Sequence, residues 1–479
     1  MFKTALAQLR FGLSAAFARP FAHWSLDALI DALLDTRREF GAIEKGGDEM
    51  LAGPILDEEM RRDVQIRRFR AQAVRAARET PYYAALFERL GLDPTKLTWD
   101  DIARLPYTPK ETLRDSPDQF VRRGGQPAFR TTTTGTTGWP TTVYFSDHEM
   151  RLYSALNAIA FLRLGQLAPE DLVLISTSSR ATLGNTCFAQ ACQRIGATWM
   201  MGGLVEPSLT LALLAEKHDL PAHKRQVSFL NIYPSYLGQL VESGLAMGYK
   251  PGDFGLERIS VGGEIVTPGL KRRAAELFGA VQFIEGYGIT EIWPVGGTLC
   301  SQGHLHFEPS QGLVEVQSSI FSLQSLGTLV ATPFPPYRET TLVLRFDTGD
   351  VVQPIAGPLT CEYKHLPPTS NILGKRRLCI EHEQGVTVPR DIIETLEDLD
   401  DVPLPARYGC WAVPGGVVVE VVTREQSGAV RRQVGAALEA RGVPLRELNL
   451  VENAEQLRHP YPWRCDLDET SFEPTRSTP

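Results

Sequence analysis

The sequence predicts a large multi-layer α/β domain with a β-rich subdomain, followed by a small α+β domain. The chain has 479 residues, which is long for one domain, and 43% of them are hydrophobic, enough for large cores. Helical patterns alternate with short apolar runs up to about residue 298, and beyond it short strands alternate with Gly/Pro turns. We therefore expect two domains, residues 1–373 and 374–479.

The segment before residue 130 is expected to be mainly helical. Its first twenty residues mix three basic residues with apolar positions, which predicts an amphipathic packing helix rather than a targeting signal. The Arg/Glu-rich stretch 57–80 has apolar residues at helical spacing and ends before Pro81. Two shorter helices follow, one ending near Gly91 and one over 99–104.

The middle of the chain alternates strands and helices, as in an α/β fold. The run TTVYFS predicts a strand with Val143 and Phe145 on one face, and a helix is expected over 147–164. After residue 298 the runs GLVEV, GTLVAT and TTLVLRF predict strands of the β-rich subdomain. Buried strands are expected at 171–176, 227–232 and 258–261, and the last domain is expected to hold helices at 388–399 and 428–441 around a strand at 416–423.

The composition argues against several classes of protein. The formal net charge is −8, so no basic field favours nucleic acid or an anionic membrane, and any phosphate site has to be local. The sequence has no apolar run of about 18 residues, the length that a membrane span needs. The seven cysteines are scattered, and an odd number at wide spacing is typical of a reducing compartment. We expect a cytoplasmic protein that binds neither nucleic acid nor membrane.

A hydroxyl-rich loop, TTTTGTTGWP, occupies residues 131–140. Its glycines allow sharp turns, so that backbone N–H groups and threonine hydroxyls can surround a polyphosphate. A polar surface turn is the alternative reading, because Thr/Gly clusters are common loops. Four motifs follow in order: GGE at 262–264, YGITE at 287–291, DTGD at 347–350 and GKR at 374–376. Each is weak alone, but their order behind the loop favours a nucleotide site.

In these motifs, and in the stretch DDIARLPYTPKETLRD, the chain resembles the adenylate-forming (AMP-binding) superfamily and its phenylacetate–CoA ligase-like branch. The resemblance covers roughly residues 67–350 and implies the adenylate-forming enzyme fold. Such enzymes join a carboxylic acid to AMP, release pyrophosphate and usually pass the acyl group to a thiol. The resemblance therefore implies ATP, Mg²⁺, and CoA or phosphopantetheine as cofactors, an acyl carrier protein as a possible partner, and a homodimer.

The resemblance also assigns roles that fit the chemistry, because two anions must be held together by donors and a metal. Tyr287 and Gly288 would flank the adenine, and Thr290 would contact the α-phosphate. Glu291 would hold Mg²⁺, a hard cation that prefers oxygen ligands. Asp350 would accept hydrogen bonds from the ribose hydroxyls. The other implied nucleotide-binding residues are Thr131, Thr132, Thr133, Thr134, Gly135, Thr136, Thr137, Gly263, Glu264 and Lys375.

The resemblance also points to a substrate pocket and a metal site. Aromatic and small residues would suit a planar aryl carboxylate, although ordinary core packing explains each aromatic nearly as well. Some phenylacetate–CoA ligase-like proteins carry structural zinc on a Cys-x5-His pair and two downstream cysteines, the second of which is Tyr363 here. His365 or His304 would then have to complete the tetrahedron. The expected substrate residues are Tyr144, Phe145, Tyr233, Gly262 and Ile284, and the expected metal ligands are Cys300, His306, Cys361 and His365.

Three departures from the family pattern put full activity in question. Trp139 replaces the usual lysine of the phosphate loop, and Lys375 stands where arginine is common. No lysine follows Lys375, whereas these enzymes bring a lysine from near the C-terminus onto the reacting groups. Arg458 or Arg464 are the candidate catalytic substitutes, although a planar guanidinium does not reproduce an ammonium point charge.

The leading functional hypothesis is ATP-dependent activation of an aryl or related carboxylic acid and its transfer to CoA or a carrier protein. The missing lysine supports an alternative on the same fold, a non-adenylating acyltransferase or an amide-forming enzyme. A protein that binds acyl groups or nucleotides without catalysis is the third hypothesis.

Overall fold

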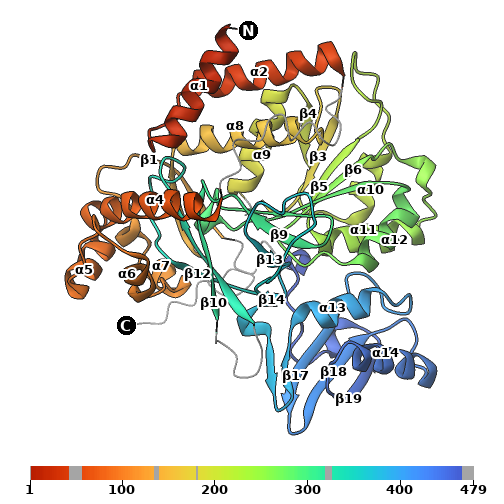
Figure 1. The fold of residues 1–479 in the computed structure, drawn as a ribbon. Helices are drawn as coiled ribbons and strands as arrows, with labels where there is room; N and C mark the ends of the chain where they lie inside the picture. The colour runs from red at the N-terminus through yellow and green to blue at the C-terminus, as the bar shows by residue number, and fades with distance from the viewer. Residues whose placement is uncertain (1, 42–56, 134–139, 180–181, 319–325, 467–479) are drawn as a thin grey trace, which may run out of the picture.

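The computed structural model describes residues 2–41, 57–133, 140–179, 182–318 and 326–466 (Figure 1). A large body holds the first residues through β13, and a smaller lobe with α13, α14 and β17 to β19 lies below it in Figure 1. The helices are α1 (Phe2–Ala16), α2 (His23–Phe40), α4 (Glu58–Glu79), α5 (Pro81–Leu90), α6 (Trp99–Arg104), α7 (Lys110–Asp115), α8 (Asp147–Arg163), α9 (Thr182–Ile195), α10 (Pro207–Ala215), α11 (Pro234–Ala246), α12 (Pro268–Phe278), α13 (Pro389–Glu397) and α14 (Gly428–Ala440).

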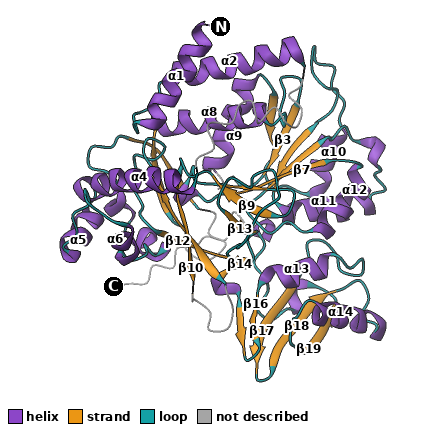
Figure 2. Ribbon diagram, in the orientation of Figure 1, coloured by secondary structure: helices purple, strands orange, loops and turns teal. Residues whose placement is uncertain are grey.

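The strands form several separate sheets (Figure 2). They are β1 (Pro127–Thr132), β2 (Thr142–Ser146), β3 (Leu172–Ser176), β4 (Thr198–Met201), β5 (Phe229–Ile232), β6 (Arg258–Val261), β7 (Gln282–Tyr287), β8 (Gly297–Leu299), β9 (His304–Phe307), β10 (Gly312–Ser318), β11 (Gly327–Pro333), β12 (Phe346–Val352), β13 (Pro368–Ser370), β14 (Gly374–Lys375), β15 (Ile380–His382), β16 (Gly385–Thr387), β17 (Tyr408–Val413), β18 (Gly416–Val422) and β19 (Leu445–Val451).

The N-terminal helices begin where the sequence offers caps. The Asp57 carboxylate accepts the N–H of Met60 at the start of α4, and Pro81 opens α5 at a position where its missing N–H costs no hydrogen bond. A reciprocal capping box between Thr98 and Asp101 starts α6. The predictions of helices near 57–80 and at 99–104 are confirmed.

The central sheet has eight strands in the order β13-β9-β8-β7-β6-β5-β3-β4. The five strands from β4 to β7 are parallel, and β7, β8, β9 and β13 pair antiparallel. The expected buried strands near 171–176, 227–232 and 258–261 are β3, β5 and β6, and all three lie in the parallel part. Parallel strands are covered on both faces, which is why their sequences read as continuous apolar runs.

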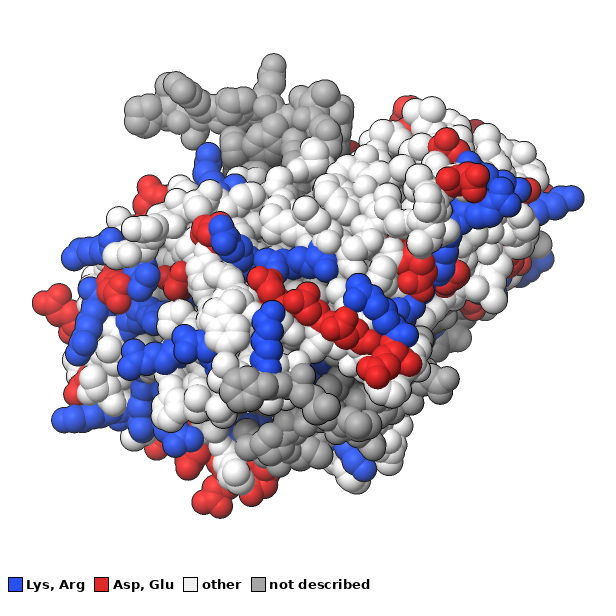
Figure 3. Space-filling model, turned by 90° about the horizontal axis from the view of Figure 1, so that it is seen from above, with Lys and Arg blue, Asp and Glu red and all other residues white. Residues whose placement is uncertain are grey.

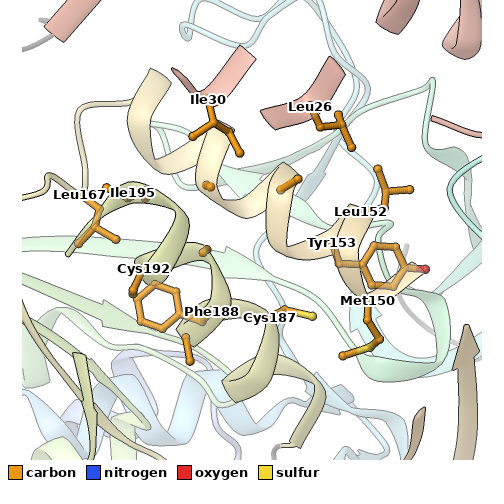
Figure 4. Packing of buried hydrophobic residues seen from close by; sticks show 14 of the residues in the cluster. Leu26, Ile30, Met150, Leu152, Tyr153, Leu167, Cys187, Phe188, Cys192 and Ile195 are labelled. Carbon is orange, nitrogen blue, oxygen red and sulfur yellow. The ribbon is translucent and has the colours of Figure 1, made fainter. Parts of the chain in front are cut away.

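Two helical layers cover this sheet. Val173 and Ile175 of β3 pack into one core with α2, α8 and α9, part of which is drawn in Figure 4. Leu174, which points to the opposite face, packs with α10, α11 and α12. The body is therefore an α/β/α sandwich, as its alternating sequence predicts.

The β-rich part is a four-stranded antiparallel sheet, β10-β11-β12-β14, with the hairpin β1-β2 beside it. The strands expected at GLVEV and GTLVAT are confirmed as β10 and β11. The expectation for TTLVLRF is wrong, because β12 begins only at Phe346. Residues 342–344 are fully or almost fully buried, and the hydroxyl of Tyr83 bonds the backbone N–H of Leu344, so tertiary packing holds this run outside the sheet.

The C-terminal lobe has its own core around β17, β18 and β19, with α13 and α14 packed on them. The pair β17-β18 is antiparallel and β18-β19 is parallel. The expected helices and the strand near 416–423 are confirmed as α13, α14 and β18. No helix in the described part of the chain is both long and apolar enough to cross a membrane.

The lobe docks closely against α12 of the body. A Cβ on Gly269 would lie 2.3 Å from the carbonyl oxygen of Glu397, so only glycine permits this approach. The Glu397 carboxyl is 2% exposed, accepts the Thr267 hydroxyl at 2.5 Å and accepts the N–H of Ala406 at 3.2 Å. Burial raises the pKa of Glu397 from its usual 4.5 to about 7, and these hydrogen bonds only partly oppose the rise.

Glu397 is expected to make stability depend on pH. Because the folded state holds this proton more tightly, its contribution is complete below pH 4.5 and is lost as pH rises to about 7, a change of about 3 kcal/mol. Glu397→Gln should therefore flatten the curve of unfolding free energy against pH over this window. Chemical denaturation at several pH values measures it. The control is Glu394→Gln on the same helix, where the carboxylate is ion-paired with Arg390 and Arg441; an unchanged slope in Glu397→Gln would contradict the assignment.

Candidate active site

The structure brings the YGITE and DTGD motifs together. Tyr287, the last residue of β7, donates its hydroxyl to Asp350 Oδ2 on β12 at 2.8 Å. Lys375 of β14 approaches the other oxygen, Oδ1, at 2.8 Å. Asp350 is 4% exposed, and burial together with this carboxylate raises the pKa of the Tyr287 hydroxyl well above its usual value. A carboxylate held between a phenol and an ammonium group can accept the hydroxyls of a sugar.

Glycine is required after Tyr287. A Cβ on Gly288 would lie 2.8 Å from the ring of Trp293, so any larger residue would displace the turn that leads to the 3-10 helix Thr290–Ile292. Thr290 begins this helix, and Glu291 is its second residue. The motif thus combines a tight turn with two residues expected to bind phosphate and Mg²⁺.

Glu291 is buried, at 1% exposure, and is paired with a residue that sequence reasoning missed. Lys110 Nζ, at the start of α7, lies 2.8 Å from Glu291 Oε1. Burial alone would raise the pKa of the Glu291 carboxyl, but the ion pair with Lys110 outweighs it, and the pKa is lowered. Glu291 is therefore an ionised oxygen donor. The available signal was the basic residue in PYTPKETLRD, a stretch that carried the resemblance without an assigned role.

The threonine loop is described only at its two ends. The Thr131 hydroxyl lies 2.5 Å from that of Thr182 at the start of α9. Thr133 donates its N–H to the carbonyl of Thr141 at 3.0 Å, and its hydroxyl accepts the N–H of Thr141 at 3.0 Å. Two of these hydroxyls therefore fasten the base of the loop. Thr132 ends β1, and the predictions for Thr134, Gly135, Thr136, Thr137 and Trp139 lie outside the described residues.

The GGE motif meets the C-terminal segment. Glu264 accepts the backbone N–H of Ser235 at 2.9 Å and that of Arg464 at 2.6 Å, and burial raises its pKa. Gly263 has a positive φ of 84°, and its missing side chain leaves room for the Arg464 guanidinium. The Arg464 Cζ lies 5.1 Å from the ring centroid of Tyr233. Glu264 thus links the C-terminal segment to the body, a contact different from the nucleotide contact expected for it.

The two candidate catalytic arginines lie in different places. Arg464 is at the GGE motif, whereas Arg458 binds within the C-terminal lobe. The Arg458 guanidinium lies 2.6 Å from Glu420 Oε1 and stacks over Trp411 with its Cζ 4.6 Å from the ring centroid. Only Arg464 therefore places a cation beside Gly263 and Tyr233.

The expected substrate residues lie in different surroundings. Phe145 is fully buried, with the Arg338 guanidinium over its ring at 4.2 Å, and is part of the core. Tyr144 faces the other side of β2, where burial and the Asp118 carboxylate raise the pKa of its hydroxyl. Tyr233 is 5% exposed and lies at Gly263. Two lining candidates remain. Gly262 directly follows the end of β6, and Ile284 lies within β7.

A second cluster contains thiols and imidazoles. The ligand atoms of Cys300, His304, His306 and Cys361 all lie within 4.8 Å of one another. His304 and His306 both lie on β9. Within the described residues His365 is not part of this group, so the expectation that it is the fourth ligand is corrected to His304. Spacing could not separate the two histidines, because the fold of the turn after Cys361 decides which one reaches the group.

The donor set fits zinc. His306 Nδ1 donates to the carbonyl of Leu366 at 3.1 Å, which directs Nε2 toward Cys361 Sγ, 3.3 Å away. Burial lowers the pKa of His306 and so favours the neutral imidazole that a metal requires. The buried Nδ1 of His304 has no hydrogen-bond partner among the described residues, as expected for an atom that would ligate a metal.

Residues 63–320 match the sequence profile of the family described as AMP-binding enzyme. The match covers more than half of the chain, so the protein belongs to this family. A sequence comparison with curated proteins found no match.

Solved structures of CoA ligases share the fold. The structure of 2-hydroxyisobutyryl-CoA ligase in the postadenylation state with R3-HIB-AMP has a TM-score of 0.66 and 18% identity, covering 82% of this chain and 86% of that chain. The same ligase in the thioesterification state with 2-HIB-AMP and CoA has a TM-score of 0.56 and 19% identity, covering 84% and 90%. The ATP-bound RpMatB-BxBclM chimera B3 has a TM-score of 0.50 and 16% identity, covering 70% and 66%. The chain has the fold of adenylate-forming enzymes.

Proposed function

We propose that this protein activates a carboxylic acid as an acyl-AMP and transfers the acyl group to the thiol of CoA or of a carrier-protein phosphopantetheine. The chain is a member of the AMP-binding enzyme family, and one observation in its structure carries the proposal. Tyr287, at the end of β7, donates its hydroxyl to Asp350, and the ionised Glu291 that follows in the same motif is paired with Lys110. This arrangement supplies an oxygen donor for a cation and an acceptor for a ribose in neighbouring positions. The solved CoA ligases of the same fold support the thiol acceptor.

The residues divide the work as follows. Asp350 accepts the ribose hydroxyls, and Thr290 with the Thr131–Thr137 loop donates to the phosphates. Glu291 would hold Mg²⁺, which would reduce the negative charge of the phosphates when bound. Lys110 keeps Glu291 ionised and adds a cation beside the same phosphates.

The same proposal addresses the missing C-terminal lysine. Arg464 is held by its own backbone N–H on Glu264, and its side chain lies over Tyr233. This anchoring holds the guanidinium beside Gly263 and Tyr233, where we expect the carboxylate to bind. Arg464 therefore takes the electrostatic role that these enzymes usually give to a lysine.

An aryl carboxylic acid is the proposed substrate class. Tyr233 offers one aromatic wall, and Gly262, where an added Cβ would meet only the carbonyl oxygen of Gly286 at 3.9 Å, leaves room for a flat ring. We also propose that residues 1–373 and 374–479 act as two domains, because one core is built within the first part and residues of the second part make up most of another. A cytoplasmic location belongs to the same proposal. A homodimer and an acyl carrier protein as acceptor belong to the same proposal.

Carboxylate-dependent exchange of labelled pyrophosphate into ATP tests the adenylation step. A panel of aryl, hydroxy and fatty acids should give exchange with at least one acid, and aryl acids should be the best. Thioester formation with CoA or with a holo carrier protein then identifies the acceptor. The opposite result is that no acid supports exchange but the protein moves an acyl group from an acyl-CoA to a thiol or amine. It would support the non-adenylating enzyme, which the absence of lysine after Lys375 favours.

A structural zinc ion on Cys300, His304, His306 and Cys361 is part of the proposal. Metal analysis of the purified protein should find about one zinc per chain. Because bound zinc stabilises the fold that presents its ligands, His304→Ala should lose the metal and lower Tm by about 5 °C or more. His365→Ala, four residues beyond Cys361, is the matched control and should keep the zinc. A metal-free, fully folded wild-type protein would refute the site.

A further inference from the structure

Helix α1 has two apolar faces, and within the described part of the chain only one of them is buried. Ala7 and Ser14 are buried, at 0% and 5% exposure, on the face toward the body. Phe11 packs against the same core and stacks on Phe21 with ring centroids 4.9 Å apart. The Arg68 guanidinium also bonds the carbonyl of Ala15, which fastens the end of α1 to α4. The inner face of α1 therefore docks the helix on the body.

The outer face of α1 carries three large apolar side chains at helical spacing, and Phe17, in the turn directly after the helix, continues the same stripe. Leu6, Leu9, Leu13 and Phe17 are 44%, 59%, 48% and 69% exposed. They lie along one side of the helix and line a shallow groove of about 470 Å³ with Arg10, Ser14, Arg19 and Pro20. Figure 1 shows α1 at the periphery of the body. A continuous exposed stripe of this kind marks an interaction surface rather than scattered surface leucines.

The charge around this stripe has one sign. Lys3, Arg10 and Arg19 are exposed, and the first acidic residue of the chain is Asp27, in α2. The whole chain has a net charge of −8, so this segment opposes the overall balance. Figure 3 shows basic and acidic side chains intermixed over the upper face of the molecule. The excess of cations is therefore a local property of α1 and its following turn.

We propose that the outer face of α1 binds an anionic lipid surface, with the leucines and Phe17 in the interface and the three cations on the headgroups. A helix with an apolar stripe bordered by Lys and Arg is suited to this position at a bilayer surface. A second copy of the chain fits less well, because pairing α1 with itself would bring together basic helices that carry no acidic residue. Lys3, Arg10 and Arg19 thus provide the local attraction to anionic headgroups that the net charge of −8 does not.

Sedimentation of the full-length protein with lipid vesicles tests this inference. The wild type should bind vesicles of equal parts phosphatidylglycerol and phosphatidylcholine, and should bind phosphatidylcholine alone much more weakly. Leu9→Glu and Arg10→Glu should each reduce binding by about ten-fold or more. The matched controls are Leu209→Glu on α10, where the leucine is 58% exposed, and Arg432→Glu on α14, and both should bind like the wild type.

Three outcomes would overturn the proposal. The first is equal binding to neutral and anionic vesicles, and the second is unchanged binding of Leu9→Glu. The third is a wild-type protein that does not bind vesicles and has the mass of a dimer in light scattering, while Leu9→Glu has the mass of a monomer. That result would assign the stripe to a second copy of the chain. Circular dichroism confirms that each variant is folded. Because α1 contributes no residue to the proposed active site, pyrophosphate exchange should be unchanged in all four variants.

Discussion

Glu291→Ala is expected to lower carboxylate-dependent pyrophosphate exchange by about 10²–10³-fold. The substitution removes an ionised oxygen donor that is buried and ion-paired with Lys110, and the YGITE motif has no second carboxylate to replace it. Glu291→Gln keeps the shape and removes the charge, so it should show nearly the same loss. Exchange rates at saturating ATP and Mg²⁺ measure the effect.

The control for Glu291 is a half-buried carboxylate that also forms an ion pair with a cation. Glu315 on β10 lies 2.9 Å from Arg345 and has 24% of its side chain exposed, so Glu315→Gln should cost stability but leave exchange per folded molecule unchanged. Lys110→Ala should lower exchange as well, since the counter-ion of Glu291 is lost. Full exchange in Glu291→Gln would contradict the role of Glu291 as a charged ligand.

Arg464→Ala is expected to lower pyrophosphate exchange by about 10²-fold, the usual cost of losing one electrostatic contact to the reacting groups. The alanine variant retains the backbone N–H that binds Glu264, so the C-terminal segment should stay in place. The loss should therefore fall on the chemical step more than on nucleotide binding. Arg464→Lys, which restores a cation, should recover part of the rate.

Arg458→Ala is the matched control for Arg464→Ala. Its guanidinium binds Glu420 and Trp411 inside the C-terminal lobe, so its removal should lower Tm and leave exchange per folded molecule unchanged. The pair of variants separates catalysis from structure. A large loss of exchange in Arg458→Ala with none in Arg464→Ala would reverse the assignment of the two arginines.

Much of the fold could be predicted because local signals agree with it. The parallel strand β3 is an apolar run that is buried throughout, and α8 begins with a reciprocal capping box between Ser146 and Glu149. The run TTLVLRF was misread because three buried aliphatic residues look the same in a strand as in a packed irregular segment. Tertiary hydrogen bonds to Tyr83, more than two hundred residues earlier, decide that case.

The sequence by itself determined the family, the order of the motifs and the types of residue at the site, because glycine turns, hydroxyl clusters and carboxylates depend on local spacing. Only the tertiary structure decided which distant groups meet: Lys110 with Glu291, Arg464 rather than Arg458 beside Gly263, and His304 rather than His365 near the cysteines. The physical reason is that ion pairs and ligand sets form between side chains from separate elements. Their contact depends on how helices, sheets and the C-terminal lobe dock, which residue spacing does not encode.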